Sequence, residues 1–391
     1  MAKLGSSMAG GDPMSQIHEQ LAQRTDVVSF AVGAPDSSVL PVELVGECAQ
    51  SALRRWGGSA LQYGSLRGFP PLLDVVGDML AARGVPTGTE RTHISTGGSG
   101  ALYSIIAALI DPGDVVLVER PTYAPAVSVF RDHGAVIVDV DTDEQGAVPA
   151  ALDLALEVCG GAVVYLLPTF QNPTGRTASA VRRCEIAEVV RRHGILAIED
   201  DVYCDLRYRG QPVPALCSYA PEHVAYVTSL SKTLAPALRI GVTTMPPPLL
   251  DAVLRVKQGI DMQTSSFNQA VATELVGAPD FELHLARVVD EYGTRMDGLL
   301  DALARHMPSS FRWSKPTGGL FVWAEGPKRF DSREMLTRAL SAGVAFMPGS
   351  AFHACGGGHS AMRLSIAGVT VADIDHGVEV LAGLCAGYSD V

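Results

Sequence analysis

The fold is decided by residues 162–200, which read AVVYLLPTFQNPTGRTASAVRRCEIAEVVRRHGILAIED. Two apolar runs, 162–168 and 195–200, flank the stretch 178–193, which carries Arg and Glu on one face and Val, Ile and Ala on the other. Apolar runs that do not alternate with polar residues are typical of strands buried on both faces of a parallel sheet. The segment therefore predicts a strand–helix–strand unit with a right-handed crossover.

The same alternation extends outward from about residue 90 to residue 246. Further strand-like runs lie at residues 93–96, 114–119, 135–140, 224–229 and 240–245, with a helix-like run at 101–110. This repetition predicts an α/β fold with helices layered on a mainly parallel central sheet.

Both chain ends carry a different pattern. A short helix and the strand-like run 27–32 lie near the start, and a long helical stretch follows three prolines up to about residue 307. Strand candidates then recur at residues 319–324, 344–347 and 362–366. These ends predict a smaller α+β domain. We divide the chain into an N-terminal arm with part of the small domain (1–45), a large domain (46–285) and a small C-terminal domain (286–391).

Composition excludes several classes of protein. Thirty Lys and Arg against 42 Asp and Glu give a net charge of −12, which argues against a broad nucleic-acid interface. Seven scattered cysteines without a Cys-x-x-Cys pair argue against a disulfide framework and a zinc site, and predict reduced, mostly buried thiols. The start lacks the apolar centre of a signal peptide, and the most apolar run is too short to span a bilayer. We expect a cytoplasmic protein without a metal, nucleic-acid or membrane partner.

A glycine-rich segment, Gly97-Gly98-Ser99-Gly100, stands between a strand-like and a helix-like run. Small residues at a helix start leave backbone N–H groups free to bind a phosphate, although an ordinary helix start capped by Ser99 fits equally well. The segment is not a P-loop or a nucleophile elbow, and Tyr103 occupies the third glycine position of a dinucleotide fingerprint. A nicotinamide dehydrogenase is therefore disfavoured.

Two further polar groups directly follow buried strands, where open α/β sheets bind ligands. Residues 171–175, Gln-Asn-Pro-Thr-Gly, contain turn formers and are a turn in the simplest interpretation. Glu199, Asp200 and Asp201 end the next strand, and a buried carboxylate there needs a cation such as a protonated heterocycle nitrogen. Solvated loop acids are the alternative.

Two cationic side chains stand among apolar residues. Lys232 ends Ser229-Leu230-Ser231-Lys232, with Arg239 seven residues on. Burial lowers the pKa of an amine and makes it a nucleophile suited to a Schiff base, whereas a lysine that reaches the surface would stay inert. Arg363 lies among strand residues and suits either a bidentate substrate carboxylate or a salt bridge.

The order and spacing of these groups make the chain resemble the class I/II pyridoxal-phosphate aminotransferases of fold type I, especially the 2-aminoadipate and kynurenine aminotransferase branch. The resemblance covers nearly the whole chain. Its matching motifs are Ser15–Glu19, Leu61–Gly64, Pro121–Tyr123, Gln171–Gly175, Ser229–Lys232, Lys257–Gly259, Gly318–Trp323 and Arg363–Ser365. It implies a three-layer fold with a mainly parallel central sheet and a smaller α+β domain.

The resemblance implies pyridoxal 5'-phosphate as cofactor and Lys232, Asp200 and Tyr123 as catalytic residues. Lys232 would form the Schiff base and move the Cα proton, Asp200 would keep the pyridine nitrogen protonated, and Tyr123 would stack on the ring. The residues implied to bind the cofactor are Gly98, Ser99, Tyr123, Asn172, Asp200, Tyr203, Ser229, Ser231, Lys232, Arg239 and Tyr63.

The implied active unit is a homodimer with shared sites, since Tyr63 would reach the phosphate of the neighbouring subunit. Arg363, with Asn172, would bind the α-carboxylate of an amino-acid or 2-oxo-acid substrate. The other residues implied on the substrate side are Gly33, His18 and Arg67.

The chain departs from its branch at three places. His18 stands where relatives carry an Arg that faces the substrate side chain, Gly98-Ser99-Gly100 replaces Ser-Gln-Gln, and Leu66-Arg67-Gly68-Phe69 replaces a Thr-Glu-Gly-Tyr type of loop. An added arginine and less bulk indicate a larger or anionic substrate; neutral drift explains the changes equally well.

The sequence therefore predicts an aminotransferase in a biosynthetic pathway, with two alternatives. The same cofactor residues also serve β- or γ-elimination, replacement or carbon–carbon bond formation, for example on S-adenosylmethionine. A transcriptional regulator that fuses this fold to a DNA-binding module would need a winged-helix segment before the aminotransferase-like region, where this sequence has only about a dozen residues.

Overall fold

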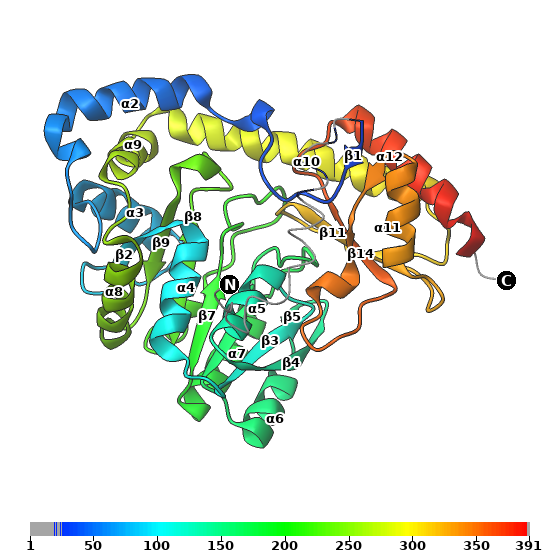
Figure 1. The fold of residues 1–391 in the computed structure, drawn as a ribbon, viewed down its shortest axis with the longest axis horizontal. Coiled ribbons are helices and arrows are strands. Elements are labelled where there is room, and N and C mark those ends of the chain that lie inside the picture. The colour runs from blue at the N-terminus through cyan, green and yellow to red at the C-terminus, as the bar shows by residue number, and fades with distance from the viewer. Residues whose placement is uncertain (1–18, 20, 22–23, 25, 389–391) are drawn as a thin grey trace, which may run out of the picture.

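The computed structural model describes residues 19, 21, 24 and 26–388, so His18 lies outside the described residues (Figure 1). Its centre is an eight-stranded sheet in the order β2-β9-β8-β7-β6-β3-β4-β5. The strands are β2 (Thr92–Thr96), β3 (Val115–Arg120), β4 (Val136–Asp143), β5 (Gly146–Ala147), β6 (Val163–Leu166), β7 (Leu196–Asp200), β8 (Val224–Ser229) and β9 (Ile240–Thr244).

The sheet is mainly parallel, as the sequence predicts. β4, β3, β6, β7 and β8 pair in parallel, whereas β9 runs antiparallel to both β8 and β2, and β5 runs antiparallel to β4. β8 and β9 are joined by residues 230–239 without an α-helical crossover, which allows only antiparallel pairing of neighbours. This connection carries Lys232 and Arg239 at the carboxyl end of β8.

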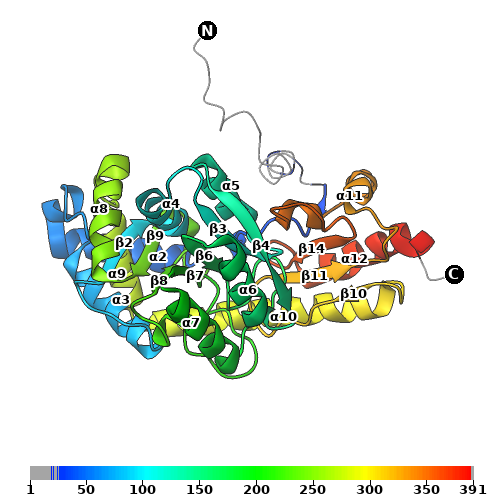
Figure 2. The same cartoon turned by 90° about the horizontal axis from the view of Figure 1, so that it is seen from below.

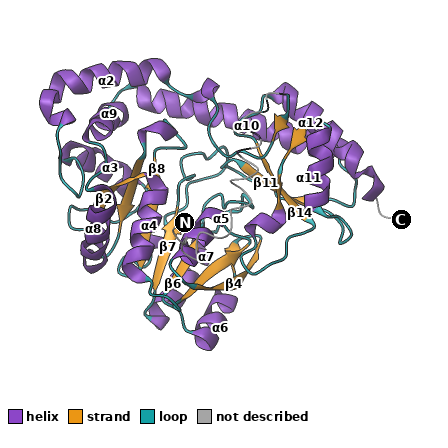
Figure 3. Cartoon of the chain, viewed as in Figure 1, coloured by secondary structure: helices purple, strands orange, loops and turns teal. Residues whose placement is uncertain are grey.

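Helices cover both faces of the sheet, which is why the central strands β6 and β8 are buried along their whole length. In β6, Val163 and Tyr165 join the core under one helical layer, while Val164 and Leu166 join the core under the other. The first layer contains α4 (Gly97–Leu109), α5 (Ala124–Asp132) and α8 (Pro247–Asp261). The second contains α2 (Val42–Trp56), α3 (Pro70–Ala82), α6 (Pro149–Cys159), α7 (Ala180–His193) and α9 (Ser266–Val276) (Figure 3).

A smaller α+β part is built from both chain ends, as expected. Its four-stranded antiparallel sheet has the order β10-β11-β14-β13, and β1 pairs in parallel with β12. Helices α10, α11 and α12 pack beside these strands (Figure 2). The bounds are β1 (Val28–Ser29), β10 (Arg312–Trp313), β11 (Phe321–Glu325), β12 (Val344–Ala345), β13 (Met347–Pro348), β14 (Ala361–Ser365), α10 (Asp280–His306), α11 (Ser332–Ser341) and α12 (Val371–Cys385).

Two sequence-based expectations are corrected. The stretch after the three prolines is not one helix but α8, α9 and α10, broken first at Met262, whose φ is +56°, and again before Asp280. The seven cysteines are all free, but only Cys48, Cys217 and Cys385 are buried, so the thiols are not mostly buried.

Helix α10 links the two parts of the molecule. Phe281 belongs to the core beneath the large sheet, and Val288 to the core of the smaller part. The domain boundaries given from the sequence, which cut this helix between residues 285 and 286, stay a prediction. Within the described ranges, no helix is long and apolar enough to cross a membrane.

Candidate active site

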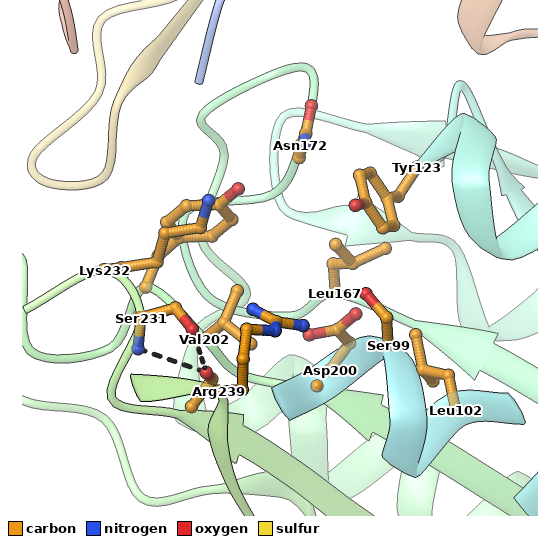
Figure 4. A pocket seen from close by; sticks show the side chains of 13 residues that line it. Ser99, Leu102, Tyr123, Leu167, Asn172, Asp200, Val202, Ser231, Lys232 and Arg239 are labelled. Carbon is orange, nitrogen blue, oxygen red and sulfur yellow. Dashed lines mark hydrogen bonds between the residues drawn. The ribbon is translucent and has the colours of Figure 1, made fainter. Parts of the chain in front are cut away.

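A cavity opens where the carboxyl ends of the parallel strands meet the start of α4 (Figure 4). Ten of the eleven residues predicted to bind the cofactor line it, although they come from segments far apart in the sequence. The lining residues are Gly98, Ser99, Leu102, Tyr123, Leu167, Asn172, Asp200, Val202, Tyr203, Ser229, Ser231, Lys232 and Arg239.

One side of this cavity is suited to an anion. Gly97 has a φ of +72°, and a Cβ there would lie 2.4 Å from Arg239 Nη2, so only glycine lets this guanidinium approach the helix start. Thr96, at the N-cap of α4, makes no side-chain hydrogen bond to the helix. The first amides of α4 therefore have no side-chain cap and can bind a phosphate, since helix N-termini attract negative charge.

Two serines complete this anion site. Ser229 Oγ lies 2.9 Å from Ser231 Oγ and accepts a hydrogen bond from the Ser231 amide at 3.1 Å. Both side chains line the cavity beside Arg239. Backbone amides, hydroxyl groups and one guanidinium together form a donor set suited to a phosphate monoester.

The floor of the cavity presents a carboxylate with an unused oxygen. Tyr165 donates a 2.6 Å hydrogen bond to Asp200 Oδ2, whereas Asp200 Oδ1 is buried without a hydrogen-bond partner. Burial raises the pKa of Asp200 to about 6, and the Tyr165 hydroxyl opposes that rise. A protonated ring nitrogen fits this site, because it supplies both the missing donor and a positive charge.

Lys232 projects into the same cavity across from Tyr123 (Figure 4). Its Nζ donates to the Gly33 carbonyl at 3.0 Å and lies 5.8 Å from the centre of the Tyr203 ring. Burial, with Arg363 and Arg239 nearby, lowers the pKa of this amine to about 8, while Asp200 opposes the shift. The lowered pKa leaves more of this amine uncharged near neutral pH, which favours a nucleophilic role.

Arg363 is a fully buried cation that pairs with no acidic side chain in the described part of the chain. Its Nη1 donates to Asn172 Oδ1 at 2.9 Å, its Nη2 donates to the Ala31 carbonyl at 2.6 Å, and its Nε has no partner. The rings of Phe321 and Phe352 lie 4.2 and 4.8 Å from its guanidinium carbon. The salt-bridge alternative is therefore wrong; Arg363 does not line the cavity itself but bonds to Asn172, which does.

The substrate-side residues are less completely assembled. A Cβ on Gly33 would lie 2.7 Å from the Phe321 ring, so this close approach requires glycine. Arg67 does not line the cavity: its backbone carbonyl accepts from the Ile94 amide, and its side chain donates to the Thr89 carbonyl, before the start of β2. Tyr63 does not line it either and is 74% exposed.

Sequence reasoning missed four residues of the site. Leu102, Leu167 and Val202 line the cavity, and Tyr165 orients Asp200 from the neighbouring strand. Tyr165 was detectable in principle, because it is the one hydroxyl in the apolar run 162–168. Its contact with Asp200 depended on the pairing of β6 with β7, which the sequence did not provide.

Known proteins resemble this chain in sequence and in fold. The family described as aminotransferase class I and II matches residues 25–381. The chain is 34% identical to aromatic-amino-acid aminotransferase 1 of Thermococcus litoralis, over 97% of this chain and 93% of that protein. A crystal structure of Pyrococcus horikoshii kynurenine aminotransferase with PMP has a TM-score of 0.94 and 31% identity, over 100% of this chain and 98% of that one.

A third similar protein is LysN, the α-aminoadipate aminotransferase of Thermus thermophilus, crystallised with N-(5'-phosphopyridoxyl)-L-leucine. Its TM-score is 0.90 and its identity 34%, over 98% of this chain and 99% of that one. The protein is thus a pyridoxal-phosphate enzyme of fold type I. It belongs to the class I and II aminotransferases, which transfer amino groups, and the elimination and replacement reactions are not favoured.

Proposed function

We propose that the chain exchanges an amino group between an amino acid and a 2-oxo acid, with Lys232 as the residue that carries the cofactor. The observation that carries the proposal is the pairing of two groups across one cavity. A partly buried amine with a lowered pKa lies on one side, and a buried carboxylate with an unpartnered oxygen lies on the floor.

The cofactor's pyridine ring, when bound, supplies an electron sink for the bonds at the substrate Cα. Asp200 would hold the proton on the ring nitrogen, and Tyr123 would pack against the ring. Asn172 and Tyr203 would bind the ring's phenolic oxygen. The α4 amides of Gly98 and Ser99, together with Ser229, Ser231 and Arg239, bind the phosphate; all these groups line the cavity.

Arg363 binds the substrate carboxylate and thereby aims the Cα hydrogen at Lys232. Because the guanidinium packs against two aromatic rings and is held by Asn172 and Ala31, it needs little reorganisation to bind a carboxylate. Lys232, whose side chain lines the same cavity, would take the proton from Cα and give it back, so one group would serve as both base and acid.

The proposed active unit is a cytoplasmic homodimer that shares its sites through Tyr63. Leu61, Tyr63, Ile260 and Met262 are 52–74% exposed, and the Gly64 amide donates to Gln263 Oε1 between the segments that carry them. Such an apolar surface favours association with a second copy. Seven free thiols support a reducing compartment.

The test is product analysis by mass spectrometry. The purified enzyme is given panels of amino acids with and without 2-oxo acids. Exchange of the amino group that depends on the acceptor supports the proposal, whereas loss of a side-chain group without an acceptor contradicts it.

A further inference from the structure

A polar cluster joins the end of α8 to the start of α4, outside the cavity; Lys257 and Thr264 are buried in it, and Thr96 and Asp261 are partly buried. Thr96 Oγ1 donates to Asp261 Oδ2 at 2.5 Å and lies 3.1 Å from Thr264 Oγ1. Lys257 Nζ donates to both Asp261 oxygens at 2.7 and 2.8 Å and to Thr264 Oγ1 at 3.0 Å. None of these four residues lines the cavity.

Thr96 connects this cluster to the helix start that lines the cavity. Thr96 ends β2, and Gly97 and Gly98 begin the helix whose first amides face the cavity. A threonine at an N-cap ordinarily bonds to its own helix amides, but this hydroxyl is held by Asp261 instead. Lys257 is 2% exposed, so its ammonium depends on Asp261 for compensation, and the pair in turn has little freedom to move.

We propose that Lys257 and Asp261 are positioning residues for the cofactor phosphate, acting through Thr96 on the first turn of α4. The inference rests on the proposed binding of the phosphate at Gly98 and Ser99. Hydrogen-bond donors contribute most when they are fixed in advance at the position of the charge, and a helix start that can shift loses that advantage.

The test compares two isosteric substitutions on paired strands. Thr96→Val removes the hydroxyl that contacts Asp261, and Thr96→Ser keeps it. Thr244→Val is the control on the paired strand, because Thr244 is buried but bonds to the Pro86 carbonyl at the opposite end of the β2–β9 pair. The readouts are the dissociation constants of the apoprotein for pyridoxal phosphate and for pyridoxal, measured by absorbance titration, and the urea midpoint of each variant.

Thr96→Val should weaken pyridoxal phosphate binding roughly tenfold, the size of one hydrogen bond to a charged group, and leave pyridoxal binding unchanged. Thr96→Ser should bind like the unmodified protein, and Thr244→Val should lower the urea midpoint without weakening cofactor binding. Asp261→Asn should also weaken pyridoxal phosphate binding. If this variant does not fold, the comparison of Thr96→Val with Thr96→Ser still tests the inference.

Equal weakening for pyridoxal and pyridoxal phosphate, an equal effect of Thr244→Val, or no effect of Thr96→Val would overturn the inference. Failure of the unmodified protein to bind pyridoxal phosphate would instead contradict the proposed function, so the two failures are distinguishable.

Discussion

At the floor of the cavity, Asp200 and Ser229 are the last residues of β7 and β8, and Lys232 follows three residues later. On the outer side, Tyr63 and Arg67 lie on a loop after α2 and do not reach the cavity within one subunit. The floor is fixed by strands buried on both faces, whereas the outer side depends on loops and on chain segments from elsewhere. The difference teaches that residues tied to the sheet are positioned by the core, whereas residues on the outer loop follow local contacts, such as the bond of Arg67 to the Thr89 carbonyl.

Among substitutions at the floor of the cavity, Lys232→Ala should cause the largest loss of activity. Because both the nucleophile and the proton carrier are lost, we expect a decrease in kcat of at least ~10³-fold without unfolding. Borohydride reduction and peptide mapping of the unmodified holoenzyme should place the cofactor on Lys232. The exposed Lys315, as Lys315→Ala, is the control. A label on another lysine would show that the cavity has been assigned wrongly.

Asp200→Asn should cause the second-largest loss of activity. It replaces the negative charge beneath the ring with a neutral amide, and loss of one such electrostatic contact costs about 10²–10³ in kcat. Asp201→Asn is the neighbouring control, since Asp201 accepts from Tyr226 and does not line the cavity. The control should change stability but leave the absorbance of the bound cofactor intact. Equal losses of kcat in both variants would show that Asp200 has no role that Asp201 does not share.

Much of the floor was predictable from the sequence because strand ends follow from apolar periodicity. The runs 195–200 and 224–229 placed Asp200 and Ser229 at the sheet edge, and the structure brings them together. The antiparallel direction of β9 and the contact of Tyr165 with Asp200 were not predictable, because both depend on which strands pair. The residues of the outer side were assigned only from the family resemblance. One of them, Arg67, donates to the Thr89 carbonyl and does not line the cavity.

A mixing experiment tests whether the outer side is completed by a second subunit. A severe Tyr63 variant and Lys232→Ala are each inactive, but their heterodimer contains one site with both defects and one with neither. After subunit exchange in equal amounts, about half of the dimers are mixed, so about a quarter of the unmodified activity should return. Lys232→Ala mixed with Asp200→Asn is the control, because both defects lie on the floor. If exchange is demonstrated and no activity returns with the Tyr63 variant, the shared site is excluded.

Tyr165→Phe should have a smaller, pH-dependent effect. The Tyr165 hydroxyl stabilises the ionised form of Asp200, so its removal raises a pKa that burial already brings to about 6. The protonated carboxyl cannot hold the positive ring nitrogen, and the acid limb of kcat/KM should therefore move to higher pH by roughly one unit. Phe130, which packs edge-on against Tyr165, provides Phe130→Leu as a packing control without a pH shift. An unchanged acid limb in Tyr165→Phe would mean that this hydroxyl does not tune Asp200.

The smallest expected effect concerns the substrate side chain and His18, which lies outside the described residues. A neutral imidazole cannot give a distal carboxylate the bidentate, permanently charged contact that arginine gives, and loss of such a pair costs about 1.5–3 kcal/mol. We therefore expect the enzyme to prefer aromatic, uncharged or sulfonium amino acids over 2-aminoadipate and glutamate. His18→Arg should shift the ratio of specificity constants toward the dicarboxylic substrates by roughly tenfold or more. Arg67→Ala tests the other cation: because its side chain is held at the Thr89 carbonyl, the substitution should leave the ranking unchanged. A strong preference of the unmodified enzyme for dicarboxylic substrates that neither substitution alters would show that the outer side recognises its substrate through other residues.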